Sequence, residues 1–73
     1  MIEKIHPGDI VEHISKNCFD ETFTVISTDS RMKLESNEWV TAFIYSSNRE
    51  NLRGTWRVIS EKEFYQRFKK VAQ

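Results

Sequence analysis

Residues that staple or bend a chain are scarce in this sequence, which has one cysteine, one proline and two glycines among 73 residues. Because Cys18 has no second cysteine to pair with, no disulfide can form within the chain, which is typical of a reducing compartment. No apolar run approaches the roughly 18 residues of a membrane span, and the first residues do not resemble a signal peptide. We therefore expect a cytoplasmic protein with no membrane partner.

Signatures of catalysis and of metal binding are also lacking. The chain has no glycine-rich phosphate loop, no nucleophile elbow and no zinc-protease helix motif. His6, His13, Cys18 and Asp20 do not have the paired spacing of a structural zinc site. We expect no enzyme activity, no cofactor and no metal.

The chain has the length of a single small domain, residues 1–73. A domain of this size buries only about 60% of the surface that its unfolded chain exposes, so its core is thin. The sequence has two Trp, two Tyr and five Phe, and such large rings bury area efficiently, which argues against disorder.

Alternating apolar and β-branched residues predict five short strands. The predicted strands cover residues 9–14, 22–28, 31–35, 39–46 and 55–59. Turn residues separate several of them: Pro7-Gly8 before the first, Asp29-Ser30 after the second, and Ser36-Asn37 after the third. Residues 39–46 have apolar groups on both faces, as expected for a central strand or for one wrapped into a barrel.

The end of the chain changes to a helical period. Ser60 and Glu63 form a capping-box pattern, and Phe64, Phe68 and Val71 follow at helical spacing. These features predict a helix over about residues 60–72, with its basic residues in the last turn. Phe64 and Phe68 are expected to pack on the sheet against Val25, Ile26, Val40, Ile44 and Val58.

Two short motifs resemble a known family. Pro7-Gly8-Asp9 followed by Ile10-Val11 resembles the first strand of many SH3-like barrels, and the C-terminal Ser-x-x-Glu-Phe-x-x-x-Phe after a strand resembles small uncharacterised SH3-like proteins of bacteria and phages. The resemblance implies architecture and carries over no site residue. The expected fold is mainly β: a small SH3-like antiparallel barrel or a curled five-stranded sheet, with one C-terminal helix.

The formal net charge of zero hides an asymmetry along the chain. Residues 1–48 hold four basic and eight acidic side chains, whereas residues 49–73 hold seven basic and three acidic ones. If each half forms its own surface, the molecule is dipolar and suits a charged partner. If strand pairing interleaves the halves, the dipole disappears, and the sequence leaves both arrangements open.

Basic and aromatic residues of the C-terminal part are the candidate binding site. Arginines beside exposed rings suit single-stranded nucleic acid, because guanidinium groups meet phosphates while rings stack on bases. The opposite interpretation is that the rings are core and the arginines form an ordinary solvated face. The candidate residues are Tyr45, Arg49, Arg53, Trp56, Arg57 and Lys69.

Together these features favour a non-enzymatic interaction module over other classes of protein. We expect a small regulator or inhibitor, of phage or mobile-element origin, that binds another protein through a charged surface. The alternative is a nucleic-acid-binding domain, which requires at least one exposed tryptophan ring. Pairing of the acidic half with the basic half of a second copy, as a homodimer, is a further arrangement that the sequence leaves open.

Overall fold

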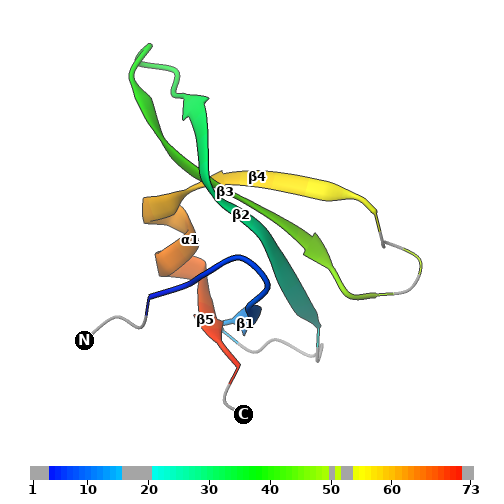
Figure 1. Cartoon of the computed structure of the whole chain (residues 1–73). Coiled ribbons are helices and arrows are strands. Elements are labelled where there is room, and N and C mark those ends of the chain that lie inside the picture. The colour runs from blue at the N-terminus through cyan, green and yellow to red at the C-terminus, as the bar shows by residue number, and fades with distance from the viewer. Residues whose placement is uncertain (1–3, 16–20, 50, 52–53, 72–73) are drawn as a thin grey trace.

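The computed structural model describes residues 4–15, 21–49, 51 and 54–71. Over these residues the chain forms one antiparallel sheet and one short helix, as Figure 1 shows. The elements are β1 (Ile10–His13), β2 (Thr22–Lys33), β3 (Trp39–Ser47), β4 (Trp56–Ser60), α1 (Glu61–Arg67) and β5 (Phe68–Lys70). The strand order is β4-β3-β2-β1-β5, with β4 and β5 at opposite edges. The prediction of a mainly β fold is confirmed in its curled-sheet form, and the sheet does not close into a barrel.

A proline–glycine turn leads the chain into β1. The Asp9 N–H donates to the His6 carbonyl at 3.1 Å, and Gly8 between them has a φ of 92°. Proline followed by a residue of positive φ is the pattern of a type II turn, which favours glycine at the second of these positions. The Asp9 carboxylate also accepts from the His6 backbone N–H at 2.8 Å. The predicted turn is therefore confirmed, and two hydrogen bonds between His6 and Asp9 stabilise it.

The predicted turn at residues 29–30 is wrong, because β2 continues through it. The pairing of β2 with β3 shifts register between Val25 and Ser27, and again between Ser27 and Ser30. The Ser27 hydroxyl donates to the Asp29 carboxylate at 2.8 Å and lies 3.1 Å from the Ser30 hydroxyl. These polar side chains satisfy one another inside a β-bulge, so residues typical of turns bend the strand without ending it.

The β2–β3 hairpin extends beyond the rest of the sheet, at the top of Figure 1. Leu34 and Glu38 close it through a 2.8 Å backbone hydrogen bond, and Asn37 has a φ of 68°. Asparagine tolerates this left-handed conformation better than most residues. The predicted turn at Ser36-Asn37 is therefore confirmed.

The C-terminal helix is shorter than predicted. The Glu63 N–H donates to the Ser60 hydroxyl at 3.3 Å, so the expected N-cap is present. The helix ends at Arg67, and residues 68–70 turn into β5, which pairs with β1. Tertiary pairing outweighs the helical pattern here, because β5 satisfies the outer edge of β1 and still buries Phe68.

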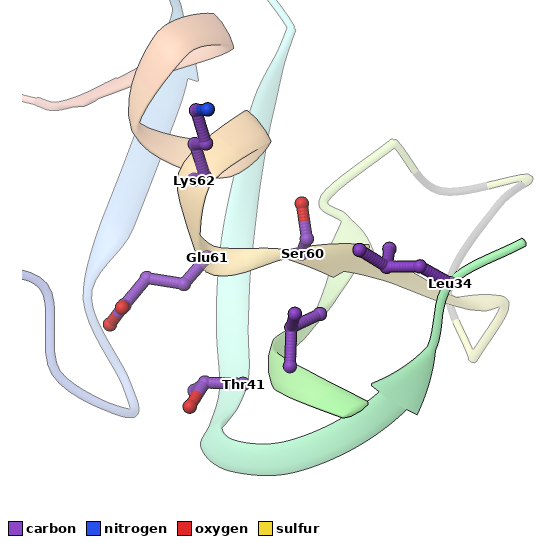
Figure 2. Close-up of a pocket in the computed structure, with 6 residues that line it drawn as sticks. Leu34, Thr41, Ser60, Glu61 and Lys62 are labelled. Carbon is purple, nitrogen blue, oxygen red and sulfur yellow. The ribbon is translucent and has the colours of Figure 1, made fainter. Parts of the chain in front are cut away.

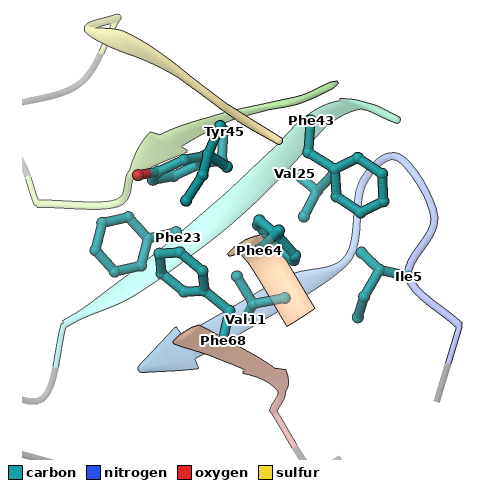
Figure 3. Close-up of a cluster of buried hydrophobic side chains, with 9 residues drawn as sticks. Ile5, Val11, Phe23, Val25, Phe43, Tyr45, Phe64 and Phe68 are labelled. Carbon is teal, nitrogen blue, oxygen red and sulfur yellow. The ribbon is translucent and has the colours of Figure 1, made fainter. Parts of the chain in front are cut away.

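The core occupies one face of the sheet, where α1 lies (Figure 3). Phe64 is fully buried among rings and aliphatic side chains of the sheet. The cluster comprises Ile5, Val11, Phe23, Val25, Phe43, Tyr45, Ile59, Phe64 and Phe68.

Of the five expected core partners, only Val25 joins this cluster. Ile26, Val40 and Ile44 are half-buried, and Val58 is 53% exposed. The expectation is wrong for Val58 because consecutive strand residues alternate between faces, and its neighbour Ile59 takes the core side.

Candidate functional site

A small polar pocket opens at the edge of the aromatic core, where the five strands and the end of α1 each contribute a residue. Its volume is 170 Å³. That is room for a handful of waters at about 30 Å³ each, and it is below the roughly 300–1,000 Å³ of pockets that hold drug-sized ligands. The lining residues are His13, Glu21, Phe23, Tyr45, Ser47, Arg57, Arg67 and Phe68. We call this hollow the arginine pocket.

Aromatic rings form the inner wall of the arginine pocket. The His13 ring stacks on Phe68 with centroids 4.6 Å apart, and Tyr45 lies 5.1 Å from Phe68. Phe23 meets the edges of these rings, at 5.3 Å from His13 and 5.6 Å from Tyr45. The packed wall holds Tyr45 in place, and Figure 3 shows its hydroxyl pointing away from the core cluster.

Two arginines supply the positive charge of the pocket. Arg57 on β4 is the cross-strand partner of Tyr45 on β3. Arg67, at the C-terminal end of α1, pairs with the Glu63 carboxylate at 3.4 Å, and both side chains of that pair are more than half exposed. The part of the chain that the structure describes offers Arg57 no carboxylate within ion-pair distance. Arg57 therefore faces the pocket as an uncompensated cation.

Glu21 brings one negative charge to the same pocket, but that charge is held by its neighbours. The Arg49 Nε lies 3.7 Å from the Glu21 carboxylate. The Ser47 hydroxyl donates to that carboxylate at 3.4 Å and accepts from the Arg49 N–H at 3.1 Å. Because Arg49 offsets Glu21, the remaining charge of the pocket is positive.

The pKa of the Tyr45 hydroxyl depends both on its burial and on the positive charge of the two arginines. Burial raises the pKa of Tyr45 above its usual value of 10.0, while Arg57 and Arg67 act in the opposite direction. The phenol is protonated at neutral pH even at its usual pKa, and the raised pKa extends the protonated form to more alkaline pH. Tyr45 can therefore donate a hydrogen bond into the pocket beside two guanidinium groups.

A second surface lies on the opposite face of the sheet, at β4. Trp56 is 62% exposed and Val58 53% exposed, and they face the same side because they are two residues apart in a strand. Their cross-strand partners on β3 are Ser46 and Ile44. We call Trp56, Val58 and Ile44 the back-face patch. Within the described residues the only helix packs on the other face, through Phe64.

The structure separates the predicted site residues into groups. Tyr45 and Arg57 come together in the arginine pocket, and Arg49 reaches it through Glu21. Trp56 lies on the opposite face of β4, although it adjoins Arg57 in sequence.

Lys69 is not among the residues that line the arginine pocket. Lys69 lies on β5, at the far edge of the sheet, where it pairs with Glu12 at 3.7 Å. Arg53 lies outside the described residues.

Sequence reasoning missed His13 and Arg67 as pocket residues. Neither residue is among the candidate binding residues that the sequence predicts. Both reach the pocket because β5 pairs with β1, which puts Phe68 opposite His13. No local pattern signals that pairing, because residues 60–71 have the spacing of a longer helix.

The acidic and basic parts of the chain are interleaved in space. Lys69 pairs with Glu12 at 3.7 Å and Lys70 with Asp9 at 3.6 Å, both across the contact between β5 and β1. Arg49 pairs with Glu21 in the same sense. Three basic residues of the second part therefore lie against acidic residues of the first, and the dipolar arrangement is lost over these contacts.

A larger and more open hollow of 350 Å³ lies between the turn end of the β2–β3 hairpin and the start of α1 (Figure 2). Its lining is Leu34, Val40, Thr41, Ser60, Glu61 and Lys62. Figure 2 shows the carboxylate of Glu61 and the ammonium of Lys62 pointing away from Leu34. The two charged residues of its lining, Glu61 and Lys62, have opposite signs, so the arginine pocket is the better candidate for a binding site.

Among the residues described here, no group of three or more His, Cys, Asp or Glu side chains is placed to hold a metal ion. The described helix is too short to cross a membrane. A scan against protein-family models, a search of curated proteins and a search of solved structures each gave no match to this chain.

Proposed function

We propose that this chain is a non-enzymatic interaction module that binds another protein by strand addition at β4. The observation that carries the proposal is that β4 is an edge strand with an exposed apolar side. On that side Trp56 is 62% exposed and Val58 is 53% exposed. Exposed edge strands are templates for an added strand, and clustered exposed apolar groups mark interaction surfaces.

The alternation along β4 specifies the partner. On one side of the strand, Trp56 and Val58 offer apolar contact beside Ile44. On the other side, Arg57 offers a positive charge with no carboxylate partner in the described structure. A strand laid along β4 presents alternate side chains to these two sides. The complementary partner is therefore an extended segment in which apolar and acidic residues alternate.

The sequence alone led us to expect docking through a broad charged surface. The ion pairs between the two parts of the chain reduce the number of charges available for such docking. Lys69 and Arg49 each have an acidic neighbour, so they add little net field to attract a partner. At β4 itself, the charge that remains for recognition is that of Arg57. Most of the area of the proposed interface is thus apolar. The single charge of Arg57 fixes the register and direction of the added strand.

Tryptophan fluorescence tests this proposal directly. Trp39→Phe leaves Trp56 as the only tryptophan, since the chain has two. We expect a synthetic peptide of alternating valine and glutamate to shift the Trp56 emission to shorter wavelength, because strand addition removes water from the ring. A peptide of the same composition with its valines and glutamates in two blocks is expected to leave the spectrum unchanged.

Two variants in the Trp39→Phe background locate the contact. Val58→Asn removes apolar area beside Trp56 and is expected to weaken peptide binding. Ile14→Asn removes an exposed side chain elsewhere on the surface, 48% exposed, and is expected to have no effect. Absence of any shift with the alternating peptide would overturn the proposal.

Single-stranded DNA provides the competing arm of the experiment. Stacking on Trp56 requires an exposed ring, which the structure provides. Salt-sensitive quenching of Trp56 by DNA, with no response to either peptide, would replace the protein partner with nucleic acid.

A further inference from the structure

We propose that the arginine pocket binds a phosphate group, either as the free ion or as the terminal group of a monoester. This inference shares Arg57 with the proposed function but concerns the core face of the sheet and needs no partner strand, so titration with inorganic phosphate tests it separately from peptide binding at Trp56. Three features carry it: the donors that converge there, the balance of charge, and the size of the hollow.

The donors come from three different elements. Arg57 extends from β4, Arg67 from the end of α1, and the Tyr45 hydroxyl from β3, and all three line the same pocket. Each guanidinium offers several N–H groups in a planar fork that matches the oxygens of phosphate, and the phenol adds an O–H. A carboxylate has only two oxygens for this set of donors, whereas phosphate has enough to meet all of them.

The charge balance favours an anion in spite of two carboxylates nearby. Glu21 lines the pocket but is offset by Arg49 at 3.7 Å and accepts from the Ser47 hydroxyl. Glu63 pairs with Arg67 at 3.4 Å, but the Arg67 and Glu63 side chains are 62% and 53% exposed, and an ion pair in contact with water is weak. Arg57 has no such competitor within the described residues.

The hollow has the size for the anion but not for a large ligand. Its 170 Å³ accommodates phosphate with a bridging water, whereas a whole nucleotide or a drug-sized molecule needs more room. The buried rings of Phe23 and Phe68 limit water on one side, which strengthens the hydrogen bonds to a charged group. The remainder of a monoester would extend through the mouth of the pocket into solvent.

The test is a two-dimensional amide NMR titration of the intact chain with inorganic phosphate, at constant ionic strength set by sodium chloride. We expect saturable shifts at the backbone amides of Tyr45, Arg57 and Arg67, with residues 31–41, at the turn end of the β2–β3 hairpin, unaffected. Phenyl phosphate forms the second arm, and binding at least as tight as that of inorganic phosphate assigns the site to monoesters. Tighter binding of inorganic phosphate assigns it to the free ion.

Arg57→Gln and Arg31→Gln form a matched pair, because each removes one positive charge from an exposed position. Loss of a charged hydrogen-bond donor is expected to weaken phosphate binding about tenfold or more in Arg57→Gln. Arg31 lies on the hairpin, away from the pocket, so Arg31→Gln is expected to bind phosphate as the parent does. Tyr45→Phe keeps the ring in the core and is expected to weaken binding through loss of the hydroxyl.

Three results would overturn the phosphate site. The first is no saturable shift in the parent chain. The second is equal weakening in Arg57→Gln and Arg31→Gln, which would indicate a general effect of charge. The third is equal affinity for acetate and phosphate, which would show that the pocket does not use the additional oxygens.

Discussion

The rings of Phe64 and Phe68 stack with centroids 4.8 Å apart and planes inclined by 26°, although one belongs to a helix and the other to a strand. The chain leaves helical geometry between them, and both rings remain in the same core, 0% and 4% exposed. The pair therefore couples α1 to the outer edge of the sheet.

Phe68→Ala is expected to destabilise the protein by about 3–5 kcal/mol, the usual cost of truncating a buried phenylalanine. That is a large fraction of the roughly 5–15 kcal/mol by which domains are stable, so the variant should be largely unfolded at modest urea concentration. Urea denaturation followed by circular dichroism measures it. Val58→Ala, at an exposed position, is the control and should remain close to the parent. Equal midpoints for Phe68→Ala and the parent would contradict the packing described here.

The two tryptophans are expected to contribute little to stability. Trp39 and Trp56 are 58% and 62% exposed, so their replacement by alanine should change the free energy of unfolding by no more than about 0.5 kcal/mol. Chemical denaturation of each single variant checks this. A loss of several kcal/mol in either variant would mean that its ring belongs to the core.

Gly8→Ala is expected to destabilise the fold by about 1–2 kcal/mol, because the φ of 92° is costly for any residue with a β-carbon. A β-carbon built at Gly8 meets nothing within 4 Å, so backbone strain is the only cause. Gly8→Asn is the matched variant and should cost less, since asparagine tolerates positive φ better. Thermal or urea unfolding of both variants decides the matter, and equal losses would point to a cause other than strain.

Tyr45 is expected to make the fold sensitive to alkali. Burial raises its pKa in the folded state above the usual 10.0, so the folded state binds the proton more tightly than the unfolded state. The resulting stabilisation is fully present below pH about 10 and is lost as the pH rises through the folded-state pKa. Unfolding free energies measured from neutral to alkaline pH should fall more steeply for the parent than for Tyr45→Phe. Parallel curves would contradict this assignment.

The sequence predicts those elements whose signals are local. Strand β3 and the Ser60 cap were recognised because alternation and capping chemistry depend on near neighbours. The predicted turn at residues 29–30 failed because Asp29 and Ser30 also suit a bulge, and the choice depends on pairing with β3. The predicted helix is too long for a similar reason, because β5 forms only through its pairing with the edge of β1.

The candidate site was predicted in part. Tyr45 and Arg57 were named on residue type, and the structure places them as cross-strand partners in one pocket. Alternation within the predicted strand implies that Trp56 and Arg57 lie on opposite faces, but the sequence could not show which of these faces the core covers. Nor could it show whether the charges segregate, which the contact between β5 and β1 decides.

The sheet joins its last strand to its first. Phe68–Lys70 pairs with β1 across nearly the whole length of the chain, and Val71 extends the contact through a 3.0 Å hydrogen bond to the Ile10 carbonyl. Contacts of such large sequence separation form late and slow folding, because a long loop must close first. During synthesis β1 therefore remains an unpaired edge until residue 70 is available. A ribosome-bound chain that ends before Phe68 would carry both an incomplete core and an open strand, the combination that chaperones recognise.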